Sequence, residues 1–260
     1  MLGTFVEIGA LHAASGTAMA ATDAAFSRIA RIQQLLSFHD PGSDLSRLNH
    51  ADGAAVELHP LSVRVIALAK HLTLSSGHAF NCTVGGTMVR KGLLPAHTDR
   101  HPAPSGHAGD IRIHGRRVRL ENGVSLTLDG IAKGYAVDLA VAALKRHGIK
   151  RGWVNAGGDL RVFGDHTIPI HVRDAAGGVV PLCPLGNAAL ARSRTIAAPD
   201  DGFRGEIIGD GVSSAPRVWS VIARHAWLAD ALTKVAANSP AAGKREMVES
   251  LGGHLVFPTA

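Results

Sequence analysis

Residues 110–148 read DIRIHGRRVRLENGVSLTLDGIAKGYAVDLAVAALKRHG, and this stretch decides the fold class. Apolar and polar residues alternate over 110–128 between glycine-containing turns, which predicts an antiparallel meander of three strands. The period then changes, and apolar residues follow helical spacing over 131–147, with Gly148 where helices commonly end. A meander that runs into a helix indicates an α+β chain with antiparallel sheets flanked by helices, not repeated β-α-β units.

Strands and helices are expected on both sides of this stretch. The last predicted helix has Ser239 as its N-cap and Pro240 at its first position, a common arrangement at helix starts. A Pro- and Gly-containing turn cluster over 37–43 ends the first helix. Further short strands are expected between 157 and 222. The other predicted elements are strands over 2–9 and 152–156 and helices over 17–36, 62–75, 228–238 and 239–251.

The length and composition describe a folded chain. Its 260 residues are about 1.7 times the usual domain size. We therefore expect one domain over 1–260, either undivided or built of two closely packed lobes. A hydrophobic fraction of 46% and a mean hydropathy of +0.13 supply a core, which excludes global disorder.

Charge and apolar patterning limit the partners. The net charge of +6 favours anions in general, but the basic residues are scattered and only 4% of residues are aromatic, so nucleic acid is not implied. No apolar run approaches the ~18 residues of a membrane helix. Residues 1–8 lack the features of an export signal. As given, the chain is expected in the cytoplasm and without a membrane segment.

Cysteine and histidine patterns do not favour a metal centre. Cys82 and Cys183 are far apart and form no CxxC pair, so we expect buried thiols and neither a zinc site nor a disulfide. Four histidines crowd one Pro- and Gly-rich stretch without helical ligand spacing, which favours a solvated loop. They are His97, His101, His107 and His114.

The stretch Thr127-Leu-Asp-Gly-Ile-Ala-Lys-Gly-Tyr135 is the clearest candidate for chemistry. A strand ends and a helix begins at a glycine, so backbone N–H groups and the positive helix end lie beside Lys133, as in phosphate sites. The pattern is neither GxGxxG nor a P-loop. A tight turn with Asp129 as the helix N-cap explains the same residues, and the sequence leaves both interpretations open.

Six blocks, taken in chain order, resemble the FAD:protein FMN transferase (ApbE) family. Together they extend from residue 2 to about 240, and their order and spacing fit the family. The blocks are Leu2-Gly-Thr-Phe-Val-Glu-Ile8, Ser37-Phe-His-Asp-Pro-Gly-Ser-Asp-Leu-Ser-Arg-Leu-Asn49, Gly77-His-Ala-Phe-Asn-Cys-Thr-Val-Gly85, Leu128-Asp-Gly-Ile-Ala-Lys-Gly-Tyr-Ala-Val-Asp138, Val154-Asn-Ala-Gly-Gly-Asp159 and Ala229-Asp-Ala-Leu-Thr233.

The resemblance implies a T-fold-related architecture and a magnesium-dependent enzyme. Such an enzyme splits FAD at its pyrophosphate and esterifies FMN onto a Thr or Ser hydroxyl of an acceptor flavoprotein. It also implies site residues by position. Mg²⁺ would be held by Gly130, Asp230 and Thr233, and FAD by His39, Ala79, Phe80, Asn81, Thr127, Asp129 and Lys133. Many relatives are periplasmic lipoproteins.

The first departure from the family pattern concerns the magnesium helix. The family usually carries Thr four residues after the Asp, whereas here Lys234 stands there and Thr233 comes one residue early. One residue rotates a helical side chain by about 100°, so Thr233 is expected to face away from the metal. We hypothesise that the Lys234 ammonium partly replaces the ion. A surface i,i+4 ion pair with Asp230 explains the same spacing.

The second departure affects catalysis. The family usually shows a Ser-His-Ile-Ile-Asp-Pro-like stretch, whereas residues 205–210 read Gly-Glu-Ile-Ile-Gly-Asp without histidine. Loss of a general base typically costs ~10²–10⁴ in rate. His225 and Glu206 are the remaining candidates, and no catalytic residue is assigned. His39, Asn81 and Thr127 also differ from the family's usual aromatic and acidic residues.

Three enzymatic or binding functions therefore compete. The chain is an active FMN transferase, a flavin-nucleotide-binding relative with little catalysis, or an FAD pyrophosphatase that releases FMN and AMP. A purely structural role is disfavoured, because packing alone does not require glycine-rich turns beside Lys and Asp. Covalent flavin on an acceptor, and the dependence of AMP release on that acceptor, distinguish the three.

Overall fold

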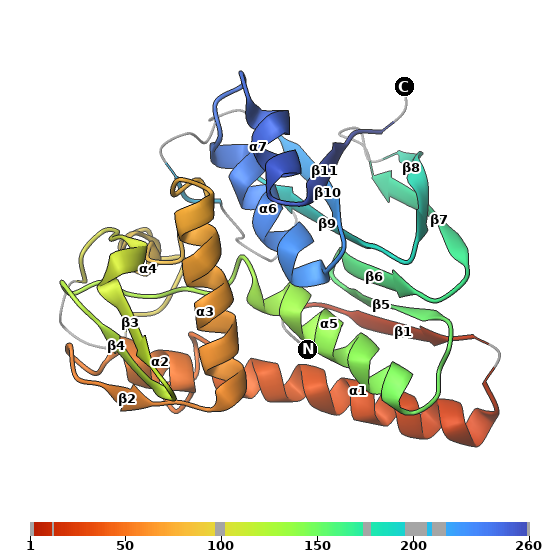
Figure 1. The fold of residues 1–260 in the computed structure, drawn as a ribbon, viewed down its shortest axis with the longest axis horizontal. Coiled ribbons are helices and arrows are strands. Elements are labelled where there is room, and N and C mark those ends of the chain that lie inside the picture. The colour runs from red at the N-terminus through yellow and green to blue at the C-terminus, as the bar shows by residue number, and fades with distance from the viewer. Residues whose placement is uncertain are drawn as a thin grey trace.

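A six-stranded antiparallel sheet in the order β1-β5-β6-β9-β10-β11 organises the chain (Figure 1). The computed structural model describes residues 3–11, 13–96, 102–173, 178–195, 207–209 and 217–258. The fold is α+β with antiparallel sheets, as the sequence predicts. The strands of this sheet are β1 (Val6–Ala10), β5 (Gly152–Ala156), β6 (Asp159–Phe163), β9 (Ala189–Arg194), β10 (Val218–Ala223) and β11 (Gly253–Val256).

Helices cover one face of this sheet. Helices α5 (Ala132–Arg146) and α6 (Ala226–Asn238) pack on its central strands and on each other. The long helix α1 (Ser15–Leu36) packs along α5, while α7 (Lys244–Ser250) lies against β11 (Figure 1). Many of the side chains that α5 and α6 bury are alanines, which lets these helices approach closely.

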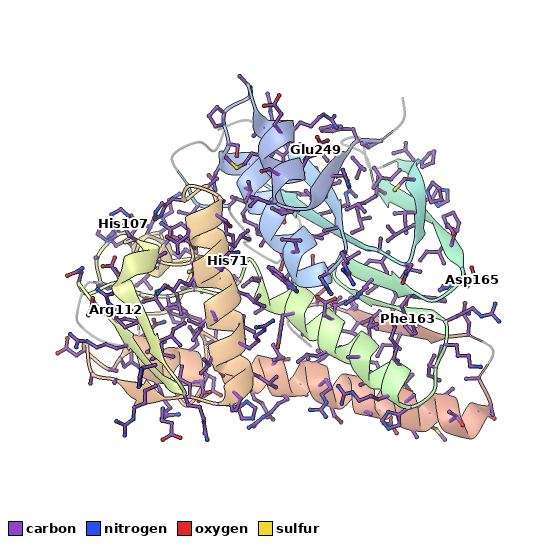
Figure 2. All side chains as sticks on the ribbon, in the orientation of Figure 1. His71, His107, Arg112, Phe163, Asp165 and Glu249 are labelled. Atoms are coloured by element: carbon purple, nitrogen blue, oxygen red, sulfur yellow. The ribbon has the colours of Figure 1, made fainter. Side chains whose placement is uncertain are left out.

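The opposite face carries the hairpin β7 (Thr167–Arg173) and β8 (Val179–Gly186). A small apolar cluster joins it to the sheet, with Leu160, Val162 and Leu190 on the sheet side. Because strand side chains alternate, the other side chains of β6, those of Asp159, Arg161 and Phe163, face the helices instead. Phe163 is one of these: it is fully buried, with the Lys145 ammonium 5.4 Å from its ring centre (Figure 2).

A three-stranded sheet forms a second part, on the far side of helix α3 from α5 in Figure 1. Its strand order is β2-β4-β3, and all its pairs are antiparallel. Buried side chains of this part and of the helix face belong to one hydrophobic cluster. The elements are α2 (Asp44–Asn49), β2 (Val56–Glu57), α3 (Pro60–Ser75), α4 (Gly85–Arg90), η1 (Ala108–Asp110), β3 (Ile111–His114) and β4 (Arg117–Leu120).

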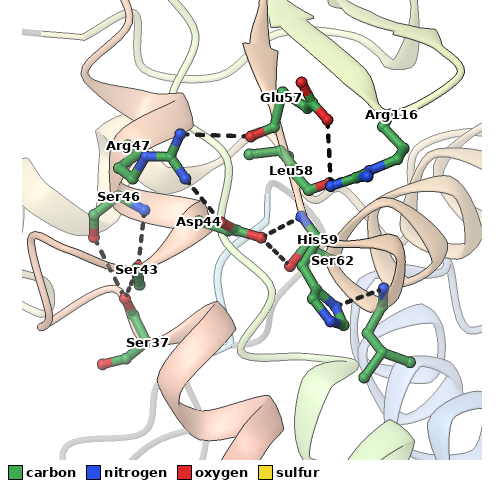
Figure 3. Close-up of polar contacts among 11 residues, drawn as sticks. Ser37, Ser43, Asp44, Ser46, Arg47, Glu57, Leu58, His59, Ser62 and Arg116 are labelled. Atoms are coloured by element: carbon green, nitrogen blue, oxygen red, sulfur yellow. Dashed lines mark hydrogen bonds and ion pairs between the residues drawn. The ribbon is translucent and has the colours of Figure 1, made fainter.

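Asp44 ties α2 to the start of α3 (Figure 3). Its carboxylate accepts hydrogen bonds from the His59 N–H and the Ser62 hydroxyl, both at 2.7 Å, and from Arg47 at 3.0 Å. The Ser43 hydroxyl caps α2 by accepting from the Ser46 N–H at 3.0 Å. The second block of the family resemblance therefore includes residues that build this junction.

Several predicted elements are confirmed. The helices predicted over 17–36, 62–75 and 228–238 are α1, α3 and α6, each starting two residues before its predicted start. The helix over 131–147 is α5, and the strand over 152–156 is β5. The first strand begins only at Val6.

The third strand of the predicted meander is wrong. Residues 124–128 do not join β3 and β4, and β2 takes the place beside β4 instead. The backbone of Leu126 is satisfied by the Asn49 side chain, at 2.8 and 2.9 Å, while Thr127 N–H donates to the Cys82 carbonyl at 2.8 Å. Side-chain and loop partners thus replace the expected ladder, which alternation alone does not reveal.

The predicted helix over 239–251 is also wrong in its start. Residue Ser239 ends α6, and its hydroxyl donates to the Val235 carbonyl at 2.8 Å. The next helix, α7, begins only at Lys244, after Gly243 at φ +82°. Ser-Pro after a helix fits a helix end as well as a helix start, and here the end is what forms.

Both cysteines are free thiols, as expected, but only Cys82 is fully buried and Cys183 is half-buried. Within the predicted histidine loop, His97 and His101 lie outside the described residues, and His107 is the N-cap of η1. His114 is the last residue of β3, so the loop prediction is wrong for His114. Across the described ranges, no helix combines the length and the apolar character that spanning a membrane requires.

Candidate functional site

The glycine turn at 127–131 leads directly into α5. Thr127 is buried, and Asp129, two residues on, is exposed. The amides of Ile131 and Ala132 donate to the Leu128 carbonyl at 3.0 and 2.8 Å, which closes the turn. Ile131 occupies the N-cap position without a side-chain cap, so the alternative with Asp129 as N-cap is wrong. The Asp129 carboxylate instead interacts electrostatically with His39 and Lys133.

Lys133, in the first turn of α5, forms an ion pair with Asp159. Its ammonium lies 3.5 Å from Asp159 Oδ2, and the Asp159 side chain is almost completely buried. Gly157 and Gly158 form the tight turn between β5 and β6 with φ values of +60° and +99°, a conformation that favours glycine. The turn starts β6 at Asp159 and so directs this carboxylate toward the helices.

The surroundings of this ion pair raise the pKa values of both of its partners. Burial and the nearby Asp230 carboxylate raise the pKa of Asp159 to about 7. The Asp159 carboxylate in turn raises the pKa of Lys133. The Asp230 carboxylate of α6 is therefore close enough to the Asp159 carboxylate of β6 to raise its pKa.

Asp230, in the second turn of α6, is 1% exposed. The Lys234 ammonium forms an ion pair with Asp230 Oδ1 and donates to the Ser193 hydroxyl at 3.0 Å. The Thr233 hydroxyl bonds to the Asp230 carbonyl at 2.6 Å and to Ser193 Oγ at 2.7 Å. Asp230 Oδ2 is buried and has no hydrogen-bond partner in the part of the chain that the structure describes. Because the Asp230 side chain is almost completely buried, this is not a surface ion pair, and the alternative of a surface i,i+4 pair between Asp230 and Lys234 is wrong.

Gly130 joins the two halves of the site. A Cβ placed on Gly130 would lie 3.2 Å from Lys234 Cε and 3.2 Å from the Phe80 ring. The turn before α5 and the acidic turn of α6 therefore lie together, an arrangement that the family resemblance implies. We call Lys133, Asp159, Asp230 and Lys234 the charged quartet; its formal charges balance.

Two further contacts set the spacing of α5 and α6. Asp138 of α5 accepts hydrogen bonds from the Ala226 and Trp227 amides, both at 3.1 Å, and pairs with Arg161 of β6. Gly134 faces the α6 backbone directly, because a Cβ there would lie 2.3 Å from the Ala226 carbonyl oxygen. Asp138 thus holds together the three elements that carry Lys133, Asp159 and Asp230.

The other predicted flavin contacts take different roles. Phe80 is 4% exposed and lies against Gly130, whereas His39 is exposed. The Asn81 carboxamide accepts from the Thr83 N–H and hydroxyl, at 2.9 and 2.7 Å, and donates to Gly106, which fixes the loop. The Ala79 carbonyl accepts from the Asn238 side chain at 3.0 Å, which ties that loop to α6.

Of the two candidate general bases, only His225 lies in the described part of the chain. His225 occupies the N-cap position of α6, and the charges that act on it come from Asp138, Arg161 and Arg224, none of them in the charged quartet. Burial lowers the pKa of His225. Glu206, Gly205 and Asp210 lie outside the described residues.

Sequence reasoning missed two members of this site. The family resemblance includes Asp159 at the end of a glycine block without a role for it, and no sequence pattern points to Ser193. The signal for Asp159 was its place after two glycines at a strand start. Ser193 carried no local signal, because only the pairing of β9 with β10 and its packing on α6 bring it to Thr233.

Comparison with known proteins names the family. The sequence model of the ApbE family matches residues 2–257. The chain belongs to the ApbE family. Among curated proteins, it is 32% identical over 185 residues to the FAD:protein FMN transferase of Rhodobacter capsulatus, a match covering 64% of this chain and 34% of that protein. The FAD:protein FMN transferase of Klebsiella pneumoniae is 28% identical over 163 residues, covering 55% and 49%.

Thus the chain spans between a third and a half of the length of these curated ApbE relatives. Solved ApbE structures share its fold over nearly all of its length. The ApbE protein of Thermotoga maritima superimposes with a TM-score of 0.83 and 26% identity, over 99% of this chain and 92% of that one. The apo flavinyl transferase ApbE of Pseudomonas stutzeri gives 0.74 and 18%, over 98% and 94%, and this lower identity supports the fold alone.

Proposed function

We propose that this ApbE chain transfers FMN from FAD to a Thr or Ser hydroxyl of an acceptor flavoprotein. Membership of the family and the names of its relatives support the reaction class. The observation that carries the proposal is the junction at Gly130, where the turn before α5, Lys133 and the α6 carboxylate lie together.

The proposed reaction is a phosphoryl transfer. The acceptor hydroxyl oxygen forms a bond to the FMN phosphorus of FAD, and the bond from that phosphorus to the bridging oxygen breaks. AMP leaves with the bridging oxygen, and the hydroxyl proton passes to a base. Lys133 would bind the diphosphate oxygens and stabilise the charge that develops on them.

The predicted flavin contacts remain part of this proposal. Phe80, packed beside Gly130, would limit the pocket on the apolar side. His39 and Asp129, which interact with each other, would face the nucleotide from the open side of the turn. Thr127 would fix that turn, since its hydroxyl accepts from the Asp129 N–H at 3.5 Å. Ala79 and Asn81 would shape the loop that carries Phe80.

Magnesium dependence needs a separate test, because the predicted donors fit the ion poorly. Asp230 Oδ2 is buried without a partner and suits a hard cation. Thr233, however, directs its hydroxyl to Ser193 and to the Asp230 carbonyl, and an ammonium already pairs with Asp230 Oδ1. The predicted ligands Gly130, Asp230 and Thr233 therefore do not form a donor set for Mg²⁺ as they lie.

The decisive experiment combines the protein with FAD and an acceptor flavoprotein subunit, in Mg²⁺ and in EDTA. Transfer predicts covalent flavin fluorescence on the acceptor after denaturing electrophoresis, and AMP release that requires the acceptor. The variant Lys133→Met should lower the transfer rate by about 10²-fold, because a charge that stabilises the phosphoryl oxygens is lost. Lys150→Met, an exposed lysine, is the matched control.

Other outcomes would change the conclusion. AMP release that is independent of acceptor would identify an FAD pyrophosphatase. FAD binding by calorimetry without AMP release would identify a flavin-nucleotide-binding relative. Absence of FAD binding would overturn the assignment of the nucleotide site to the charged quartet.

A further inference from the structure

The Lys234 ammonium is surrounded by oxygen atoms. It pairs with Asp230 Oδ1 and donates to the Ser193 hydroxyl at 3.0 Å and to the Asp230 carbonyl at 3.2 Å. An ammonium group has three N–H donors, so these three oxygens account for all of them. Carboxylate, carbonyl and hydroxyl oxygens are also the ligands that hard divalent cations take in proteins.

Lys234 is held along its length as well as at its end. Its side chain is 20% exposed, and that of its partner Asp230 only 1%. Its Cε and Cδ lie against Gly130, where a Cβ would approach them to 3.2 and 3.5 Å. A flexible surface lysine would show neither feature, so this ammonium is a fixed part of the site.

The charges of the quartet also favour Lys234 as a fixed part of the site. Asp159 and Asp230 are both buried, and Lys133 and Lys234 supply one positive charge for each of them. A divalent ion on Asp230 would meet the Lys234 charge across the same carboxylate, and like charges at such short range repel. Without the lysine, Asp230 would be a buried carboxylate with no cation on its own helix.

We propose that the Lys234 ammonium permanently takes the place of a divalent cation at Asp230, so that this site binds a diphosphate without metal. The proposal rests on the proposed function in one respect, because the diphosphate is taken to be that of FAD. Lys133 remains available to the ligand, because its side chain is 28% exposed and its ion pair with Asp159, at 3.5 Å, is longer than that of Lys234 with Asp230.

The first experiment tests the metal without any nucleotide. Mn²⁺ is titrated by electron paramagnetic resonance into the wild type, Lys234→Thr, Lys234→Met and the control Lys150→Met. Lys234→Thr removes the charge and adds a hydroxyl oxygen, whereas Lys234→Met removes the charge alone. We expect Lys234→Thr to gain a Mn²⁺ site absent from the wild type and the control, Lys234→Met to gain a weaker one, and Asp230→Asn in the Thr background to abolish it.

The second experiment measures ADP, a probe of the diphosphate, by calorimetry in EDTA and in Mg²⁺. Wild-type affinity should differ by less than about threefold between the two conditions. Lys234→Met should lose about tenfold or more in EDTA and regain part of it in Mg²⁺. Circular dichroism and thermal melting establish that each variant is folded.

Two results would overturn the inference. One is a Mn²⁺ site in the wild type, with or without ADP, that disappears in Asp230→Asn. The other is wild-type ADP binding that requires Mg²⁺ and is unchanged by Lys234→Met. The wild-type comparison decides even when a Lys234 variant does not fold. Failure of both FAD and ADP to bind the wild type would instead count against the proposed function, and the Mn²⁺ titration would still decide the role of Lys234.

Discussion

The two sides of the charged quartet differ in how firmly they are bonded. On the α6–β9 side, Lys234, Asp230, Thr233 and Ser193 form hydrogen bonds of 2.6 to 3.2 Å and an ion pair within one helical turn and one strand. On the α5–β6 side, Lys133 and Asp159 meet at 3.5 Å. Each side has one buried carboxylate oxygen without a hydrogen-bond partner among the described residues, Asp159 Oδ2 and Asp230 Oδ2.

This difference indicates which side of the charged quartet can receive a ligand. The Lys234 ammonium already donates to three oxygens and gains little from a further acceptor. The Lys133 side chain is 28% exposed and its ammonium lies 3.5 Å from Asp159, so it can still donate to a phosphate oxygen. The α5–β6 side is therefore the side that responds to a phosphate, and the α6–β9 side is prearranged before any ligand arrives.

The largest effect should come from forcing the two sides apart. Gly134→Val would press a side chain into the Ala226 backbone, where a Cβ alone would lie 2.3 Å from the carbonyl oxygen. We expect a loss of about 3 kcal/mol or more in the free energy of unfolding, measured by urea denaturation. Gly109→Val, at a position with open space around its Cβ, should cost less than about 1 kcal/mol. Equal losses would contradict the close contact.

The next effect should come from the tie between the sides. Asp138→Ala would leave Arg161 without its ion pair, at 17% side-chain exposure, and remove the acceptor for two α6 amides. We expect a loss of about 3 kcal/mol in unfolding free energy. Asp165→Ala, an exposed residue after β6 (Figure 2), should have little effect. A small loss for Asp138→Ala would show that packing alone positions α6.

A smaller effect should appear as a dependence on pH. Burial and Asp230 raise the pKa of Asp159 from 3.8 to about 7, while the Lys133 and Lys234 charges oppose this. The folded state then binds a proton more tightly than the unfolded state, so stability should fall as pH rises from about 4 to about 7 and level off above. The expected fall is at most about 4 kcal/mol, since each pKa unit corresponds to about 1.4 kcal/mol.

Urea denaturation at a series of pH values measures this dependence. Asp159→Asn should flatten the profile between pH 4 and 7, since the amide does not titrate. Stability of the wild type that rises over this window would show that Lys133 and Lys234 outweigh burial at Asp159.

The smallest effect should come from the firmly bonded side. Ser193→Ala removes one acceptor from Lys234 and one from Thr233, but each keeps a bond to Asp230. We expect a loss of about 1 kcal/mol in unfolding free energy. Ser250→Ala, whose hydroxyl bonds to Met247 on the exposed end of α7, is the control. A loss above about 3 kcal/mol would mean that Ser193 holds this side together.

Much of the fold could be predicted because its signals are local. The helices α1, α3 and α5 follow from apolar spacing, and β5 from a short apolar run beside two glycines. The failures occur where partners come from far along the chain. Leu126 lies in an alternating stretch but bonds to Asn49, and no local pattern contains that information.

The candidate site divides in the same way. The turn at Gly130, Lys133 and Asp230 could be predicted from glycine spacing and the family resemblance. The role of Asp159 depends on a sheet turn that directs it to Asp230, and that of Ser193 on the packing of β9 against α6. The surroundings of Lys234 could be suspected from its spacing, but only the structure shows how deeply Asp230 is buried.

The alternation along β6 limits how this protein can change over evolution. Asp159 faces the charged quartet, while its neighbour Leu160 faces the apolar cluster under the hairpin. An insertion or deletion of one residue in the preceding turn would exchange these two orientations. One inserted or deleted residue would thus disrupt both the Lys133–Asp159 ion pair and the apolar cluster under the β7–β8 hairpin. A substitution at Asp159 or at Leu160 would damage only one of them.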